Sequence, residues 1–323
     1  MTWTRSGRAK TSALLGALAL TVFAGAKGLS RSASSTLTPP IGEFVLVNGK
    51  QVHYHLSGPE NAPAVVLIHG ASGNLRDFTY SLAPELAKEF RVLVFDRPGL
   101  GYSENLHASG ESPQEQARHL ADATIKIGVE HAVLVGHSYG AAVAMAWALE
   151  RPDQAAGLVS LGGVLNPWPG GLGAWYDITG SWLGGLTIVP LIATFATKGM
   201  AEKSVESIFE PDPIPDEYLD YVGSDLTLRS KVLRTNARQV GGLRPYMVEL
   251  SQQYERLELP IEALHGSADT IVPLSIHSQP LSERLTNVNL TVLGGVGHMP
   301  HHANQSATII AIKRATYRAG LRD

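Results

Sequence analysis

The sequence predicts an α/β fold: a mostly parallel sheet with helices on both faces, interrupted late in the chain by a mainly helical insertion. Three observations predict it. Short, continuous apolar runs of strand length recur along the chain, as expected for strands buried on both faces. Segments with helical spacing separate these runs, which implies parallel strands joined by right-handed crossovers. The alternation stops near residue 166 and resumes near residue 258.

The composition is that of an ordinary globular protein. The 323 residues are 44% hydrophobic and 17% charged, which suffices for a substantial core. The net charge of -3 provides no strongly basic face, so no nucleic-acid partner is expected. Cysteine is absent, which excludes disulfides, thiolate metal sites and a cysteine nucleophile.

The N-terminal segment differs from the rest of the chain. Basic residues precede an uncharged apolar run that ends in the small residues Ala24–Ala26. This order is typical of a secretory signal, so residues 1–26 are predicted to be a signal peptide and the protein to be exported, periplasmic or secreted. The alternative is an uncleaved anchor that attaches the protein to a membrane through residues 11–26. The Ser- and Pro-rich residues 27–40 are predicted to be a disordered linker.

The α/β core is predicted over residues 41–165 and 258–323. It begins with two alternating stretches around Asn48-Gly49, the strongest short hairpin signal. A helix is expected after Ser112-Pro113, an N-cap followed by a first-turn proline, and should end at Gly128. Buried strands are expected in these apolar runs: AVVLI, RVLVF, HAVLV and AAGLVSL.

Residues 166–257 are predicted to form a helical cap inserted into this single domain. Strand–helix alternation is missing there, and three tryptophans, Trp168, Trp175 and Trp182, occur among many glycines and prolines. After the insertion, strands are expected in PIEALHG and NLTVLGG with a helix between them. A last helix should end near Leu321.

The segment GHSYG, residues 136–140, matches the pattern G-x-S-x-G directly after an apolar strand and before a helix. A serine hydroxyl is a poor nucleophile and must project from the sheet toward a base. The strained turn that presents it requires small flanking glycines. Ser138 is therefore the predicted nucleophile, and the N–H of Tyr139 at the helix start is a predicted oxyanion donor. The alternative is a chance match in a Gly-rich connection.

The predicted base and acid each follow a later strand, in the chain order Ser, acid, His. His298 lies directly after NLTVLGG and its short turn and is the predicted base, whereas His301 and His302 are expected on or near the following helix. No metal site is expected from these histidines, because no Asp or Glu accompanies them in the sequence. Asp269 in GSADTIVP is predicted to orient His298. Its alternative role is a turn residue that caps the next helix.

The loop HGASGN after the first buried strand completes the predicted site. Gly70 permits a close approach of the backbone, and the N–H of Ala71 is the second predicted oxyanion donor. His69 is expected to support this loop. Asp96 and Arg97, in FDRPGLGYS, are expected to stabilise the geometry of a neighbouring loop. All these loops lie at the carboxyl ends of strands, where open α/β sheets build their sites.

In their order along the chain, HGASG, DRPGLGYS, GHSYG, GSADTIVP and GVGHMPHH resemble the α/β-hydrolase fold family, from about Ile41 to the last helix. The resemblance is to the serine-nucleophile branch with a cap domain, which is esterase- and lipase-like on an epoxide-hydrolase-like frame. It implies that the insertion is the cap over the active site and that no cofactor takes part. Epoxide hydrolases and haloalkane dehalogenases use aspartate where Ser138 stands, which argues against both activities.

The resemblance implies a serine hydrolase that cleaves a small-molecule carboxylic ester through an acyl-enzyme. The Trp-rich, weakly charged cap favours an apolar acyl or alcohol group. Carbon–carbon bond hydrolysis on the same triad is an alternative, although the Pro-Gly usual in the first oxyanion loop of such enzymes is missing from HGASGN. Cofactor-free haloperoxidase or perhydrolase chemistry is another. A non-catalytic binding protein is disfavoured, because a candidate for every member of the triad is present.

Overall fold

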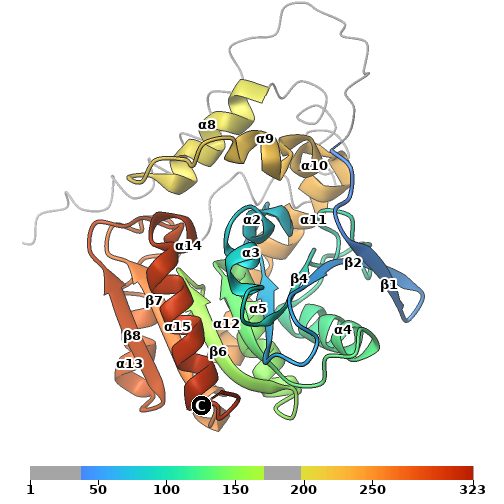
Figure 1. Cartoon of the computed structure of the whole chain (residues 1–323). Helices are drawn as coiled ribbons and strands as arrows, with labels where there is room; N and C mark the ends of the chain where they lie inside the picture. Colours follow the sequence, from blue (N-terminus) through green and yellow to red (C-terminus); the bar gives the residue numbers. More distant parts are fainter. Residues whose placement is uncertain (1–37, 171–197, 323) are drawn as a thin grey trace, which may run out of the picture.

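The computed structural model describes residues 38–170 and 198–322, and these form one mixed sheet covered by helices (Figure 1). Eight strands pair in the order β1-β2-β4-β3-β5-β6-β7-β8. The pairs β1–β2 and β2–β4 are antiparallel, and the remaining pairs are parallel. The predicted α/β class is therefore confirmed. The strands are β1 (Glu43–Val47), β2 (Lys50–Ser57), β3 (Ala64–Ile68), β4 (Arg91–Phe95), β5 (Ala132–His137), β6 (Ala155–Leu161), β7 (Ile261–Gly266) and β8 (Val288–Leu293).

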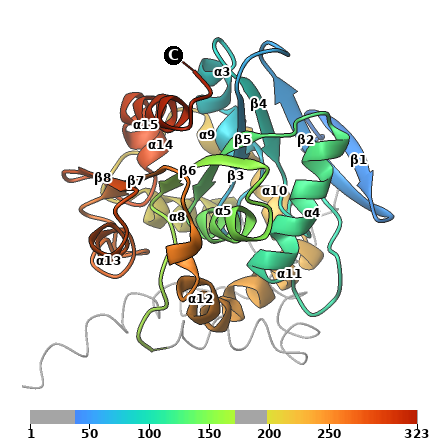
Figure 2. The same cartoon turned by 90° about the horizontal axis from the view of Figure 1, so that it is seen from below.

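Helices cover both faces of the sheet, and Figure 2 shows the two layers. Buried side chains of α3 and α15 pack on one face. Those of α4, α5, α12 and α13 pack on the other. The helices are α2 (Arg76–Thr79), α3 (Leu82–Leu86), α4 (Pro113–Lys126), α5 (Tyr139–Glu150), α8 (Lys198–Phe209), α9 (Tyr218–Val222), α10 (Ser224–Leu228), α11 (Ser230–Gly241), α12 (Leu243–Ser251), α13 (Ser278–Arg284), α14 (Pro300–Ala303) and α15 (Gln305–Arg318).

Local sequence signals account for the ends of these elements. Asn48 and Gly49 both have positive φ angles, 50° and 76°, as the tight turn between β1 and β2 requires. Helix α4 begins with a capping box, in which the Ser112 hydroxyl accepts from the Glu115 N–H while the Glu115 carboxylate accepts from the Ser112 N–H. Gly128 follows the helix with a φ of 82°, which glycine adopts without strain. These predicted boundaries are confirmed.

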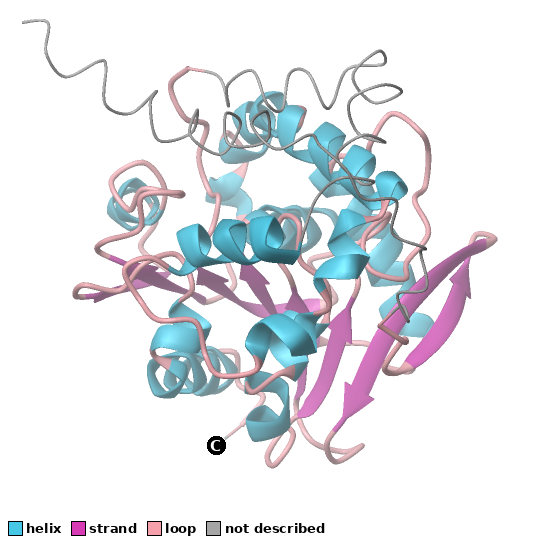
Figure 3. Cartoon of the chain, turned by 90° about the horizontal axis from the view of Figure 1, so that it is seen from above, coloured by secondary structure: helices cyan, strands magenta, loops and turns pink. Residues whose placement is uncertain are grey.

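The described part of the insertion is helical, and α8 to α11 lie over the carboxyl ends of the strands (Figures 1 and 3). Helix α12 behaves differently, although it falls within the range predicted as cap. Its buried Leu243, Met247 and Leu250 belong to the same hydrophobic cluster as α5. Helix α12 therefore forms part of the layer that covers the sheet. Trp168 packs at the edge of this cluster, whereas Trp175 and Trp182 lie outside the described residues.

The chain enters the described fold beside the cap. The predicted leader, residues 1–26, and most of the predicted linker lie outside the described residues. At the end of the predicted linker, Thr38 donates two hydrogen bonds to Asp225 of α10, at 3.0 and 2.5 Å. The guanidinium of Arg76 also donates to the Pro39 carbonyl at 2.7 Å. Among residues 38–170 and 198–322, no helix combines the length and apolar character needed to cross a membrane.

The capping box of α4 leads to a stability prediction. Ser112→Ala removes the acceptor for the Glu115 N–H and should lower the free energy of unfolding by about 0.5–2 kcal/mol, as measured by urea denaturation. Ser282→Ala is the matched control, since the Ser282 hydroxyl donates only to a carbonyl of its own exposed helix turn. It should change the free energy by no more than about 0.5 kcal/mol. Equal effects of the two substitutions would contradict the role of the cap.

Candidate active site

Ser138 stands on a strained turn between β5 and α5. Its φ of 52° and ψ of -117° are outside the regions that L-residues normally adopt. A Cβ on Gly140 would lie 2.1 Å from the carbonyl oxygen of Ile68, and one on Gly136 would lie 2.4 Å from that of Gly140. Both positions therefore require glycine. Backbone bonds hold the turn, since Ser138 donates to the Leu161 carbonyl at 3.0 Å.

His298 and Asp269 form a buried pair in the loops after β8 and β7. Nδ1 of His298 lies 2.8 Å from Oδ2 of Asp269, and a carboxylate can only accept there. The other carboxylate oxygen accepts from the N–H groups of Ile271 and Val272, at 3.0 and 2.9 Å. Burial alone would raise the pKa of Asp269, but the charge of His298, followed by contacts with His265 and the Val272 N–H, brings it far below its usual value. The charged acid therefore fixes the tautomer in which Nε2 of His298 carries the lone pair.

The turn that bears Ser138 is linked to the loop that bears His298. Nε2 of His137 lies 3.0 Å from the His298 carbonyl oxygen, and the two rings are 4.9 Å apart. Gly162, at the end of β6, lies so close to the pair that a Cβ there would be 3.4 Å from Nδ1 of His298. No hydrogen bond joins the Ser138 hydroxyl to His298 within the described part of the chain. Such bonds often form fully only when substrate is bound.

The predicted oxyanion donors lie on either side of Ser138. Tyr139 is the first residue of α5, so its N–H has no carbonyl one turn earlier in the helix to bond. On the other side, a Cβ on Gly70 would lie 3.1 Å from the Ser138 Cβ, which places the start of the Gly70–Ser72 loop against Ser138. The N–H of Ala71, the middle residue of this loop, meets no acceptor among the described residues.

The cap holds this oxyanion loop in place. Ser72 has a φ of 58°, a left-handed conformation that costs energy in a residue other than glycine. Asn236 of α11 accepts from the Ser72 N–H at 2.7 Å and donates to its hydroxyl at 2.9 Å. Thr227 of α10 donates to the Ser72 carbonyl at 2.9 Å. Ala71 precedes this clamped residue, so the direction of its N–H depends on the cap. The sequence contains no signal for the Asn236 contact, because 164 positions separate the two residues.

Arg97 connects the start of the Gly70–Ser72 loop, the turn that bears Ser138 and the cap. Its fully buried guanidinium donates to the carbonyls of His69 and Gly70 at 2.9 and 3.0 Å, and to Gln239 of α11 at 3.0 Å. It also lies 4.2 Å above the Tyr139 ring. Burial lowers the pKa of Arg97 to about 10, so it stays charged at neutral pH. The structural role predicted for Arg97 agrees with these contacts.

Two buried histidines support loops of the site as neutral rings. Nε2 of His69 accepts from the Arg97 N–H at 3.0 Å, while its Nδ1 donates to the Gly70 carbonyl at 2.8 Å. Nδ1 of His277 accepts from the N–H groups of Leu165 and Asn166, each at 3.2 Å. Burial lowers the pKa of each histidine to about 4. Because each ring serves as an acceptor, protonation would break a hydrogen bond as well as bury a charge.

His301 and His302 lie on α14, as the sequence predicts, but an acid does accompany them. Asp77 of α2 lies 3.2 Å from Nε2 of His301 and 2.8 Å from Nε2 of His302. The premise that these histidines have no neighbouring carboxylate is therefore wrong. The sequence carried no signal for the contact, because more than 220 positions separate Asp77 from both histidines.

The comparisons with known proteins agree with this architecture. A family model of the alpha/beta hydrolase fold matches residues 63–305. A 2-hydroxymuconate semialdehyde hydrolase of Pseudomonas sp. (strain CF600) is 26% identical over 284 residues, which cover 84% of this chain and 93% of the relative. The chain belongs to the α/β-hydrolase fold family and is an enzyme of the hydrolase class.

Solved esterases share the fold at low sequence identity. A thermophilic esterase from Thermogutta terrifontis matches with a TM-score of 0.65 and 19% identity, over 86% of this chain and 99% of that chain. An esterase from Rhodococcus sp. ECU1013 matches with a TM-score of 0.66 and 21% identity, over 88% of this chain and all of that chain. At this identity the likeness concerns the fold.

The Asn236 clamp leads to a prediction about turnover. Asn236→Ala frees the Ser72 N–H and should lower kcat roughly tenfold to a hundredfold with little change in KM, because the oxyanion donor beside it is misplaced. Steady-state hydrolysis of a chromogenic ester measures this. Lys231→Ala, an exposed position on the same helix, is the control and should leave kcat unchanged. A normal kcat in the Asn236 variant would show that the clamp has no part in turnover.

The neutral histidines lead to a prediction about pH. The folded-state pKa values of His69 and His277 lie below the ordinary 6.5, so the unfolded chain binds more protons between about pH 6.5 and 4. The free energy of unfolding contributed by these two neutral histidines is therefore fully present above pH 6.5. It is lost as the pH falls toward 4, by up to about 1.4 kcal/mol per pH unit for each histidine. Urea denaturation at pH 7, 6 and 5 measures the slope. His277→Gln should reduce the slope, and an unchanged slope in that variant would contradict the assignment.

Proposed function

We propose that this chain is a serine hydrolase that cleaves carboxylic esters of small molecules through an acyl-enzyme. Ser138 is the nucleophile, His298 the base and Asp269 the residue that orients the base. The observation that carries the proposal is the 2.8 Å bond between His298 and Asp269 beside the strained turn of Ser138. Backbone strain at a serine costs free energy. Such strain is typical of sites where the turn presents the hydroxyl to a base for a reaction.

The proposed reaction follows from the positions of these groups. Nε2 of His298 takes the hydroxyl proton as Oγ of Ser138 attacks the ester carbonyl, and Asp269 stabilises the imidazolium. The N–H groups of Ala71 and Tyr139 donate to the oxyanion that forms. The alcohol then leaves with the proton from His298. Water, activated by the same ring, attacks the acyl-enzyme and releases the acid.

The proposed substrates carry an apolar acyl or alcohol group. Supporting this, the stretch from residue 166 to residue 197, at the start of the insertion, contains three tryptophans and a single charged residue, Asp177. Trp168, the described tryptophan of this stretch, is partly buried against the core cluster, with its ring 6.5 Å from that of His277. Since His277 holds the loop after β6, this part of the insertion adjoins the loops of the site.

A second candidate is hydrolysis of a carbon–carbon bond by the same three residues. It is favoured by the similarity to the 2-hydroxymuconate semialdehyde hydrolase, which extends over 93% of that relative. The same serine, base and oxyanion donors would serve a ketone carbonyl as well as an ester carbonyl. The missing Pro-Gly in the first oxyanion loop keeps ester hydrolysis as the first candidate.

The place of action proposed for the enzyme is outside the cytoplasm. The basic, apolar and small-residue order of residues 1–26 supports export, with membrane attachment through residues 11–26 as the alternative. N-terminal sequencing of the protein from a native fraction distinguishes them. A new N-terminus after Ala26 indicates cleavage, whereas an intact leader in a membrane fraction indicates an anchor.

Labelling by a fluorophosphonate tests the function. The probe should attach to Ser138 in one-to-one stoichiometry, as read by intact mass and peptide mapping, because it reports a serine activated by a base. Ser138→Ala should not label. The labelled wild-type enzyme should lose its hydrolysis of p-nitrophenyl esters. A folded wild-type protein that fails to label would overturn the proposal.

A substrate series then separates the two candidates. The kcat/KM values for p-nitrophenyl esters of increasing acyl length are compared with the value for a vinylogous 1,5-diketone of the ring-fission type. A preference for the esters that rises with apolar chain length supports the first candidate. A diketone value that exceeds every ester value by a hundredfold or more establishes the second.

A further inference from the structure

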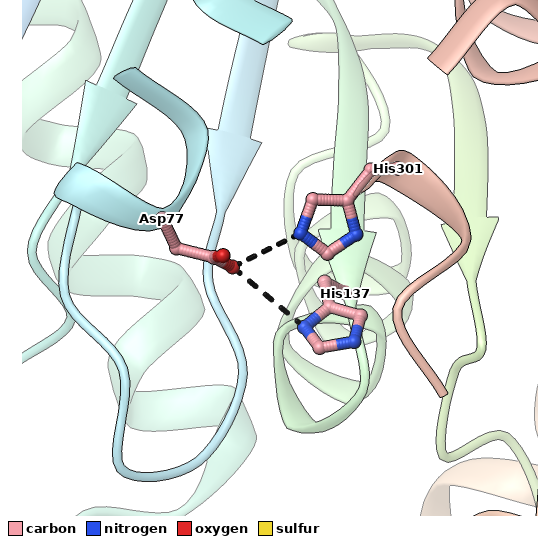
Figure 4. A group of neighbouring side chains, drawn as sticks. All are labelled: Asp77, His137 and His301. Carbon is pink, nitrogen blue, oxygen red and sulfur yellow. Dashed lines mark hydrogen bonds and ion pairs between the residues drawn. The ribbon is translucent and has the colours of Figure 1, made fainter. Parts of the chain in front are cut away.

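Three buried side chains outside the triad converge on one point (Figure 4). Asp77 comes from α2, His137 from the end of β5 and His301 from α14. One ligand atom from each lies within 4.8 Å of the other two. Oδ2 of Asp77 is 3.2 Å from Nε2 of His301 and 3.9 Å from Nδ1 of His137.

The proton on His137 determines what this point can hold. Nε2 of His137 faces the His298 carbonyl, which only accepts, so the ring keeps its proton on that nitrogen. In the neutral imidazole with its proton on Nε2, Nδ1 carries the lone pair. This Nδ1 is buried and has no hydrogen-bond partner among the described residues. It points toward a carboxylate oxygen, which is also an acceptor.

Two acceptors that face each other in a buried place are unfavourable unless a hydrogen-bond donor or a cation lies between them. We propose that Asp77, His137 and His301 bind a divalent transition-metal ion of the zinc class. The ligand atoms are Oδ2 of Asp77, Nδ1 of His137 and Nε2 of His301. Two imidazoles and one carboxylate form a donor set that suits Zn²⁺, with water in the remaining position.

The distances are close to those that such an ion requires. Zinc binds nitrogen and oxygen at about 2.0–2.2 Å, which separates neighbouring ligand atoms by roughly 3.3 Å. The separation between Asp77 and His301 already meets this value at 3.2 Å, and that between Asp77 and His137 exceeds it modestly at 3.9 Å. The third separation, between Nδ1 of His137 and Nε2 of His301, is at most 4.8 Å, so binding requires the His137 ring to move toward the other two ligands.

Neighbouring groups orient the carboxylate for this role. Oδ1 of Asp77 accepts from the Tyr218 hydroxyl and lies near Nε2 of His302, each at 2.8 Å. Oδ2 is thereby directed toward His137 and His301. Such outer contacts fix the orientation of metal ligands in proteins. The ring of Phe78, itself fully buried, lies 5.1 Å from that of His301.

The ion would have a structural role. It would join α2, the strand before Ser138 and α14, while His298 keeps its own bond to Asp269. The inference does not depend on the proposed ester chemistry, so each can fail without the other. Metal binding should raise the thermal midpoint of the protein, because the ion binds the folded state and not the unfolded chain.

Direct titration with a spectroscopic probe tests the site. Protein freed of metal by a chelator is titrated with Co²⁺, and visible d–d absorption should grow to a plateau at one equivalent. Zn²⁺ should abolish this absorption by displacing Co²⁺, and should raise the thermal midpoint. Absence of a saturating one-equivalent signal in the folded wild-type protein would overturn the proposal.

Variants assign the ligands. Asp77→Asn and His301→Gln should each raise the Co²⁺ dissociation constant at least a hundredfold and abolish the thermal shift with Zn²⁺. His298→Gln is the matched control, since it alters a neighbouring buried histidine that is not a ligand, and it should bind Co²⁺ like the wild type. Unchanged affinity in both ligand variants refutes the assignment. If Asp77→Asn does not fold, His301→Gln and the wild-type titration decide.

Discussion

The site depends on how closely the start of α5 approaches the end of β3. A Cβ on Gly140 would lie 2.1 Å from the Ile68 carbonyl and 2.7 Å from that of His69, so only glycine allows this contact. The contact brings Ser138 beside the Gly70 loop and sets the backbone N–H groups around the serine. It is made entirely by backbone atoms. The surrounding side chains therefore hold the start of α5 and the loop after β3 at a fixed distance from each other.

Arg97 and Asn236 show how the cap helps to hold the loop after β3 in place. Arg97 bonds to the His69–Gly70 backbone and to Gln239, while Asn236 holds Ser72 by two hydrogen bonds. Asn236 and Gln239, the two cap residues in these contacts, both lie on α11. Helix α11, which lies between β6 and β7 in the sequence, thus sets the conformation of the Gly70–Ser72 loop from a different part of the chain. If this loop supplies the proposed oxyanion donor, a substrate that moves α11 would alter turnover as well as access.

The sequence predicted the parts of the molecule that depend on local signals. These signals, which depend only on neighbours in the chain, are the apolar runs, the Asn48-Gly49 turn and the capping box at Ser112. The order of the parallel strands also agrees with the rule for right-handed crossovers. Contacts between distant segments left no such signal. Asp77 beside His301 and Asn236 beside Ser72 join residues whose types are common on any surface helix. The position of α12 on the core was missed for a similar reason, since an amphipathic helix fits a cap or a core layer equally well.

The hydrogen bonds from Thr38 to Asp225 also fix the side of the molecule at which the chain enters the described fold. The chain joins the fold on the side of the cap, beside α10. Between residue 26 and Thr38, a fully extended chain reaches roughly 40 Å. In an anchored form, the bilayer would therefore lie within that reach of the cap rather than of the opposite face. If the proposed anchor and the proposed apolar ester substrates both hold, esters dissolved in the membrane would reach the enzyme from the side of the cap.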